Sequence, residues 1–192
     1  MSIFECIVIA LALGIESMII VRPCAEAVPI RLTRGLLVSA IITLIFAVMM
    51  IIGLAIGDLL AFTDESMAGQ YQQTNELIYL GFMIIVSVKL LMGARKKNSQ
   101  PMAYNLSRWT TVFALAIAAG INVMLVGMGV AFVAEFSSNW VRCVVPLVLI
   151  TWLLTYWAIM LGRSKTAIRE RRWKFIVMLL LLMSAIFRVV EF

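Results

Sequence analysis

The stretch ALALGIESMIIV, residues 10–21, returns later in the chain as AIAAGINVMLVG, residues 116–127. Five of the twelve aligned positions are identical, and most of the others are apolar in both copies. Each copy carries one strongly polar residue at the same position, Glu16 in the first and Asn122 in the second. The chain therefore contains an internal repeat, with a polar pair at equivalent points of its two copies.

The composition is typical of an integral membrane protein. Of the 192 residues, 64% are hydrophobic and 14% are charged, whereas a soluble domain is about half apolar and about a quarter charged. Six apolar stretches are long enough to cross a hydrocarbon layer roughly 30 Å thick, which takes a helix of about 20 residues. They cover residues 3–21, 35–57, 77–94, 109–134, 143–162 and 174–190. We therefore predict an all-α, polytopic membrane protein with six transmembrane helices.

The charged residues of the connections indicate the orientation. The connections after the first, third and fifth spans hold most of the lysines and arginines, and those after the second and fourth spans are acidic or nearly neutral. Basic connections face the cytoplasm in most membrane proteins, so both termini are expected outside. The net charge of +6 is then explained by topology, without a nucleic-acid partner.

In this orientation the first and fourth spans, which carry the two copies of the repeat, cross the membrane in opposite directions. We predict two inverted three-helix repeats, residues 1–94 and 109–192, joined by a basic cytoplasmic linker at 95–108. Inverted repeats are typical of secondary transporters, whose binding sites lie near the middle of the membrane where the repeats meet.

Glu16 and Asn122 mark the predicted site. A carboxylate at the centre of a membrane helix costs about 2.5–3.5 kcal/mol on insertion scales, so such residues usually face a cavity and have a function. Gly14 and Gly120 each stand two residues before the polar residue. Glycine at this place permits either a close approach of two helices or local unwinding.

Three polar residues of other spans are candidate neighbours. Lys89, in the third span, is the expected charge partner of Glu16, and a purely structural Glu16–Lys89 pair is the alternative to a binding site. Thr43 and Thr151, in the second and fifth spans, are expected to add hydroxyl oxygens, although threonine in a helix often bonds back to its own backbone. The amide of Asn122 has a structural alternative as well, since it can simply join two helices.

Cysteine and histidine are less informative. Cys6, Cys24 and Cys143 stand at unrelated spacings and are interpreted as small buried hydrophobic residues. The chain has no histidine, which removes the commonest general base and metal ligand and argues against an intramembrane enzyme.

Three stretches resemble the manganese efflux pump family of the lysine-exporter-like superfamily. LALGIESM, residues 11–18, resembles the acidic motif of its first helix. ALAIAAGINVMLVGMGVAF, residues 114–132, is similar to the second copy of that motif, and LITWLLTYWAIMLGR, residues 149–163, is similar to the fifth helix. The resemblance covers nearly the whole chain and implies the six-span plan, Mn²⁺ as the transported ion and no tightly bound cofactor.

Carried over position by position, the resemblance implies a metal site. Glu16 and Asn122 stand where the family has its first-repeat and second-repeat aspartates, and Gly127 and Gly129 belong to its most specific block. The chain departs from the pattern because its second span has no carboxylate and Asp58 lies only at its outer end. One membrane carboxylate therefore stands where several are expected.

Two functions follow from these observations. The first is a secondary active transporter of the bacterial cytoplasmic (inner) membrane that exports a divalent cation by proton-coupled alternating access. The alternative, favoured by the missing acidic residues, is a divergent, non-transporting membrane subunit or an exporter of a different small solute. The expected partners are the lipid bilayer and the cation. A homo-oligomer and a membrane partner subunit are both compatible with the sequence.

Overall fold

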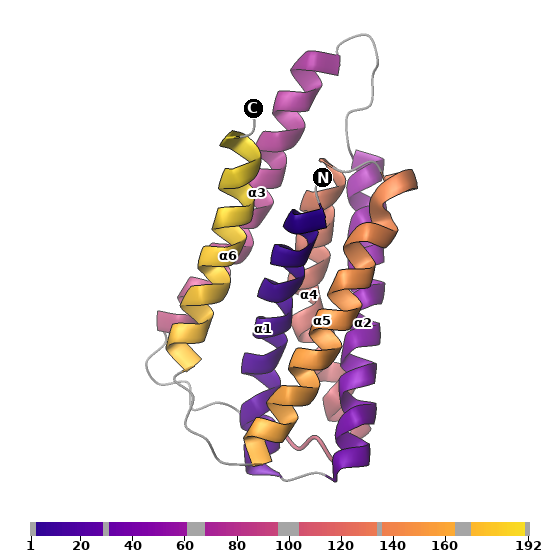
Figure 1. Cartoon of the computed structure of the whole chain (residues 1–192), viewed down its shortest axis with the longest axis vertical. Coiled ribbons are helices and arrows are strands. Elements are labelled where there is room, and N and C mark those ends of the chain that lie inside the picture. Colours follow the sequence, from indigo (N-terminus) through magenta and orange to yellow (C-terminus); the bar gives the residue numbers. More distant parts are fainter. Residues whose placement is uncertain are drawn as a thin grey trace.

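The computed structural model describes residues 3–28, 31–60, 68–95, 104–133, 136–163 and 170–190. These residues form six helices and no strand (Figure 1). The helices are α1 Ile3–Ala27, α2 Leu32–Leu60, α3 Ala68–Arg95, α4 Trp109–Ala131, α5 Phe136–Arg163 and α6 Glu170–Val190. The predicted all-helical architecture is confirmed, and most helices continue several residues beyond the apolar stretches that predicted them. Of the expected linker at 95–108, residues 96–103 lie outside the described part of the chain.

Five helices contain segments that are long and apolar enough to cross a membrane, judged by length and composition alone. These segments are Ile3–Ala27, Leu32–Leu60, Thr74–Met92, Trp109–Ala131 and Trp140–Gly162. Over the described residues α6 is not among them. The sixth predicted span, residues 174–190, forms part of α6 and stays a prediction.

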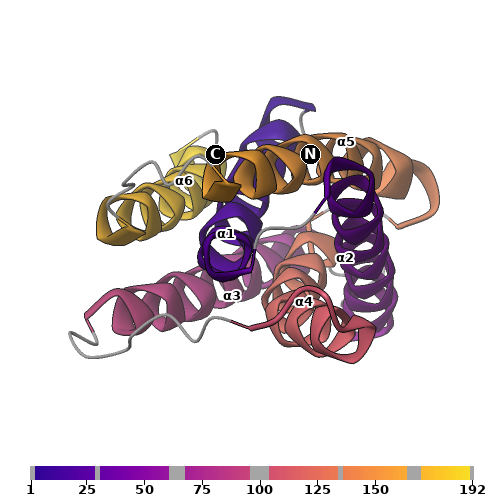
Figure 2. The same ribbon diagram turned by 90° about the horizontal axis from the view of Figure 1, so that it is seen from below.

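The six helices form a ring in which each packs mainly against two others. The order around the ring is α1–α5–α2–α4–α3–α6, with α6 returning to α1. The most extensive packing joins α1 to α5 and α2 to α4, whereas α1 and α4 have little direct contact. Viewed along the bundle, α3 and α6 lie on one side and α2 and α4 on the other, with α1 between them (Figure 2). Among the described pairs of consecutive helices, α3 and α4 alone are neighbours in the ring, so the fold is held together mainly by contacts between distant parts of the sequence.

Glycines of α4 allow its backbone to approach two neighbours. A Cβ atom on Gly127 would lie 2.8 Å from the carbonyl oxygen of Met50 in α2. A Cβ atom on Gly129 would lie 2.9 Å from the Cβ of Phe82 in α3. Close backbone approach through small residues is the usual basis of helix association in membranes, where the hydrophobic effect contributes little.

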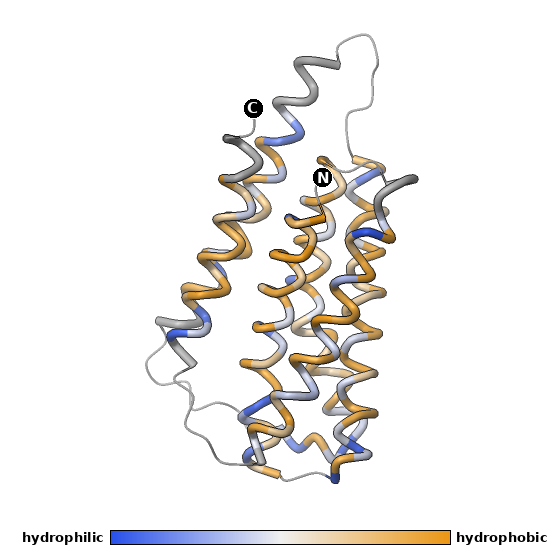
Figure 3. Tube along the Cα trace, in the orientation of Figure 1, coloured by the Kyte–Doolittle hydropathy of each residue, from blue (hydrophilic) through white to orange (hydrophobic). Residues whose placement is uncertain are grey.

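The outer surface of the bundle is strongly apolar. Large hydrophobic side chains that are more than half exposed include Phe4, Leu44 and Leu153. Hydrophobic residues cover most of each helix, and strongly hydrophilic ones gather mainly toward the helix ends (Figure 3). A soluble protein rarely exposes so much apolar surface, whereas a membrane protein presents it to lipid.

Candidate functional site

The two polar residues of the repeat meet inside the ring. Glu16 lies in the middle of α1 and Asn122 in the middle of α4. Both are buried, with 4% and 7% of their surface exposed. The side-chain Nδ2 of Asn122 donates a hydrogen bond to Oε1 of Glu16. This bond joins two helices that otherwise touch very little.

Lys89 of α3 completes a chain of three polar side chains. Its Nζ donates a hydrogen bond of 2.5 Å to Oδ1 of Asn122. The expected direct pair with Glu16 is not formed, because the amide of Asn122 stands between the ammonium and the carboxylate. An amide can both donate and accept, so Asn122 links the positive and the negative group.

Several buried oxygens near the middle of the bundle lack hydrogen-bond partners. Oε2 of Glu16 and the hydroxyl oxygens of Thr43 and Thr151 are buried and unpaired, as is the hydroxyl of Ser87. The two threonines therefore do not bond back to their own helices, and neither is hydrogen-bonded to Glu16. Leaving a buried polar group without a partner costs about 1–3 kcal/mol. Such groups call for an explanation, and a bound ion or water is one.

Two glycines set the packing around the polar chain. A Cβ atom on Gly14 would lie 2.8 Å from Cδ1 of Leu154 and 3.5 Å from the Cα of Thr151, both in α5. A Cβ atom on Gly120 would lie 2.9 Å from Cγ of Met49 in α2. Both glycines lie within uninterrupted helix. They therefore permit close approach in this structure, and the local unwinding considered from the sequence does not occur.

The structure also contains a buried polar contact between α1 and α5 that was not predicted from the sequence. Oγ of Ser17 and Oγ1 of Thr155 lie 2.6 Å apart and hydrogen-bond across the α1–α5 interface. Ser17 follows Glu16 directly, and Thr155 follows Thr151 by one helical turn on the same face of α5. This spacing of two threonines was the one available signal, although it does not reveal the partner helix.

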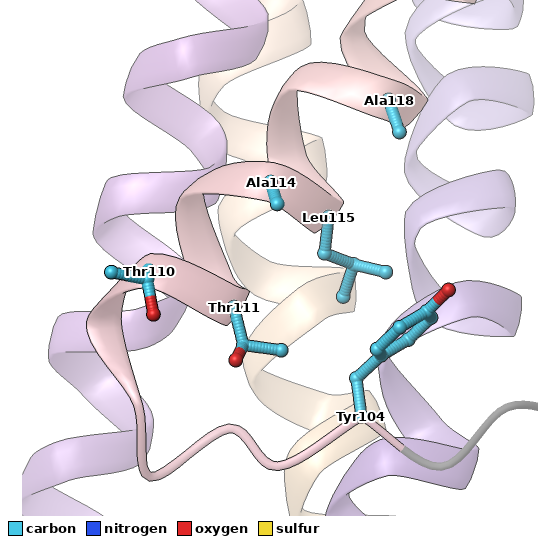
Figure 4. Close-up of a pocket in the computed structure, with 6 residues that line it drawn as sticks. All are labelled: Tyr104, Thr110, Thr111, Ala114, Leu115 and Ala118. Atoms are coloured by element: carbon cyan, nitrogen blue, oxygen red, sulfur yellow. The ribbon is translucent and has the colours of Figure 1, made fainter.

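An open pocket lies at the beginning of α4. Its volume is about 330 Å³. It is lined by Tyr104, Thr110, Thr111, Ala114, Leu115 and Ala118 (Figure 4). Figure 4 shows the lining residues of α4 on successive turns, with the ring of Tyr104 beside Leu115. Ala118 precedes Asn122 by one helical turn, so the pocket ends one turn away from the polar chain.

The donor set of the polar chain is poor in charge. Within the described ranges, no group of three or more His, Cys, Asp or Glu residues could hold a metal ion. A cation beside Glu16 would depend on one carboxylate and on neutral oxygens from side chains, backbone or water.

Comparison with known families gives a match over most of the chain. Residues 29–187 match the family Mntp, described as "Putative manganese efflux pump". The matched segment covers most of the chain and contains Asn122 and Lys89, whereas Glu16 precedes it. Neither a curated protein nor a solved structure with significant similarity was found.

Proposed function

The chain belongs to the Mntp family of manganese efflux pumps, which are transporters and not enzymes, and we propose that it exports Mn²⁺ across the bacterial inner membrane by alternating access. One observation carries this proposal. The hydrogen bond from Asn122 to Glu16 joins equivalent positions of the two sequence repeats inside the helix ring. Transporters built from inverted repeats bind their substrates at such a place.

The packing of the helices supports two inverted repeats, α1–α3 and α4–α6. Exchanging α1 with α4, α2 with α5 and α3 with α6 leaves the ring of neighbours unchanged. The extensive α1–α5 packing becomes the extensive α4–α2 packing, and α1–α6 becomes α4–α3. The two halves thus make equivalent contacts, as a two-fold relation requires.

Two close glycine contacts support the same relation. Gly57 of α2 and Gly162 of α5 each face one carbonyl oxygen and one alanine Cβ on the partner helix. For Gly57 these atoms belong to Met128 and Ala131, and for Gly162 they belong to Arg22 and Ala25. Met128 and Ala131 follow Arg22 and Ala25 by 106 positions, which is also the interval from Glu16 to Asn122.

The oxygens of the polar chain suit a hard cation. Mn²⁺ prefers carboxylate, carbonyl and water oxygens, and Glu16 and Asn122 offer the first two. Oε2 of Glu16 is buried without a hydrogen-bond partner, so it is available to a ligand. Water and the unpaired hydroxyls of Thr43 and Thr151 are the proposed source of the remaining ligands.

Lys89 compensates the single negative charge of the site while no cation is bound. While its ammonium bonds to Oδ1 of Asn122, the charge of Glu16 has a positive counterpart nearby and the empty site is close to neutral. An arriving cation takes the oxygen of Asn122 only when Lys89 withdraws. The lysine side chain is exposed, so it has room to withdraw. We propose that Lys89 and the cation occupy the site alternately.

The direction of transport follows from the proposed orientation, with both termini outside. The pocket at the beginning of α4 then opens toward the cytoplasm and serves as the entry to the site. In the proposed proton coupling, Glu16 takes up a proton from outside after the cation leaves and releases it to the cytoplasm before the next cation binds.

A second candidate function rests on the neutral balance of the site. One carboxylate and one ammonium compensate each other, which suits a solute with less charge than a divalent cation. In that case the fold and the site are retained and the manganese chemistry is lost.

The cellular manganese content of an exporter-deficient bacterium tests the proposal. The cells express the wild-type chain, Glu16→Gln or Glu26→Gln under manganese load, and elemental analysis measures the metal. Glu26 is the matched control because it lies on the same helix and its side chain is 46% exposed. We expect wild type and Glu26→Gln to lower the manganese content severalfold and Glu16→Gln to have no effect.

Equal amounts of the three proteins in the membrane are required for the comparison. A Glu16→Gln variant that exports as well as wild type would refute the assigned site. Failure of all three proteins to lower the manganese content would refute manganese export and favour the second candidate.

A further inference from the structure

Two of the three cysteines meet although they are far apart in the sequence. The Sγ atoms of Cys6 in α1 and Cys143 in α5 lie 2.9 Å apart. Both side chains are buried, with 3% and 4% of their surface exposed. They stand near the beginning of their helices, in the interface between the two helices that pack most extensively. Their contact joins the two proposed repeats.

We propose that Cys6 and Cys143 form a structural disulfide bond at the outer end of the α1–α5 pair. The sulfurs of a disulfide are about 2.0 Å apart, so the two Sγ atoms, now 2.9 Å apart, need only a short further approach to form the bond. The bond forms when both thiols lose their hydrogen atoms and a sulfur–sulfur bond replaces them. The two electrons and two protons pass to a disulfide-bearing thiol oxidase of the extracytoplasmic compartment, whose own disulfide becomes two thiols.

In the proposed orientation, the pair of Cys6 and Cys143 lies at the outer, oxidising side of the membrane. The beginnings of α1 and α5 lie at the outer side of the membrane, where disulfides form and persist. Cys24 lies near the opposite end of α1, on the cytoplasmic side, and its sulfur contacts the carbonyl oxygen of Ile20 at 3.5 Å. The chain thus has a thiol pair on the oxidising side and a single thiol on the reducing side.

The bond would stiffen the α1–α5 pair without blocking transport. The pair equivalent to α1–α5 under the two-fold relation is α2–α4. Relative motion of these two pairs leaves the disulfide undisturbed. Reduction is therefore expected to lower the thermal stability and to leave export unchanged.

Thiol labelling of the full-length protein from membranes tests the proposal. Cells are quenched with acid, the protein is denatured with a metal chelator present, and a maleimide of high mass labels free thiols before and after reduction. We expect a label on Cys24 alone before reduction and on all three cysteines after it. Cys24→Ser should carry no label before reduction, and Cys6→Ser should carry labels on Cys24 and Cys143.

Two outcomes would overturn the inference. Labels on all three cysteines before reduction would mean that Cys6 and Cys143 are two free thiols in contact, without a bond between their sulfurs. A parallel sample without chelator tests whether the two cysteines bind a soft metal ion. Such an ion is the alternative because Met50, whose sulfur could also bind it, lines the same small cavity as the two cysteines. Protection that disappears when the chelator is added would assign the pair to a metal and not to a disulfide. The labelling pattern does not depend on transport, so the inference fails or stands separately from the proposed function.

Discussion

At the scale of single residues, Asn122 determines how the candidate site works. An aspartate at this position would add a second negative charge next to Glu16. The asparagine instead donates to Glu16 and accepts from Lys89, so it connects the two groups through its amide. Within the described residues, the polar chain formed by these three side chains contains a single carboxylate. Its affinity for a divalent cation therefore depends on whether the ammonium of Lys89 is bonded to Asn122 or has withdrawn.

Replacing Lys89 tests this dependence. Lys89→Gln removes the positive charge that competes with the cation for Asn122. Mn²⁺ should therefore bind at least tenfold more tightly, because a single and a double positive charge about 10 Å apart repel each other by about 3 kcal/mol at an effective dielectric constant near 20. The loss of free Mn²⁺ signal in electron paramagnetic resonance measures binding to the purified protein in detergent.

Arg142→Gln is the matched control, since it removes a positive charge from an exposed residue of α5. Its affinity should equal that of wild type. Equal affinities of wild type and Lys89→Gln would show that the ammonium does not compete with the cation.

At the scale of helices, the backbone contacts at glycine are the most constrained feature. Gly57 lies so close to α4 that a Cβ atom would come within 2.5 Å of the carbonyl oxygen of Met128. Gly162 makes the corresponding contact with α1, at 2.9 Å from the carbonyl oxygen of Arg22. A carbonyl oxygen belongs to the helix backbone, so neither contact can be relieved by turning a side chain.

Alanine substitutions measure these contacts. Gly57→Ala should lower the free energy of unfolding by about 1–3 kcal/mol, the usual cost of overpacking. Gly162→Ala should act in the same direction because its contact is the equivalent one. Thermal unfolding in detergent, followed by size-exclusion chromatography of the heated samples, measures both variants.

Gly81→Ala is the matched control in α3, where an added Cβ atom would meet nothing within 4 Å. It should be neutral or more stable by about 1 kcal/mol, because alanine is the better helix former. A Gly57→Ala protein as stable as Gly81→Ala would contradict the close packing of α2 against α4.

At the scale of the whole molecule, the ring of six helices determines which ends share a side of the membrane. The described chain begins and ends toward the same end of the bundle (Figure 1). The basic connections predict that this end faces outside. The direction of export and the compartment of the cysteine pair both depend on this orientation.

Labelling of introduced cysteines tests the orientation. In a variant with Cys6, Cys24 and Cys143 replaced by alanine, a membrane-impermeant maleimide added to whole cells should label Leu59→Cys and spare Tyr104→Cys. Leu59 is 85% exposed at the end of α2, and Tyr104 is 43% exposed just before α4. The reverse pattern would invert the proposed direction of transport. After cell lysis both positions should react, which controls for accessibility.

Much of this protein could be predicted from its sequence alone. Apolar stretches of sufficient length predict membrane helices because the hydrocarbon layer leaves the backbone little other choice. The repeat around Glu16 and Asn122 predicted the central polar pair, because residues at equivalent positions of two repeats are expected to meet where the repeats meet. Both inferences rest on information carried by short stretches of sequence.

Other features were decided only by the tertiary structure. These are the partner of Lys89, the unpaired hydroxyls of Thr43 and Thr151, and the contact between Cys6 and Cys143. Each depends on the order of the helices in the ring and on how far each helix is rotated about its axis. Neighbours in the ring are mostly distant in sequence, and the uniformly apolar helices carry little pattern to indicate which face turns inward. Close packing of the whole bundle therefore selects the partners of these side chains.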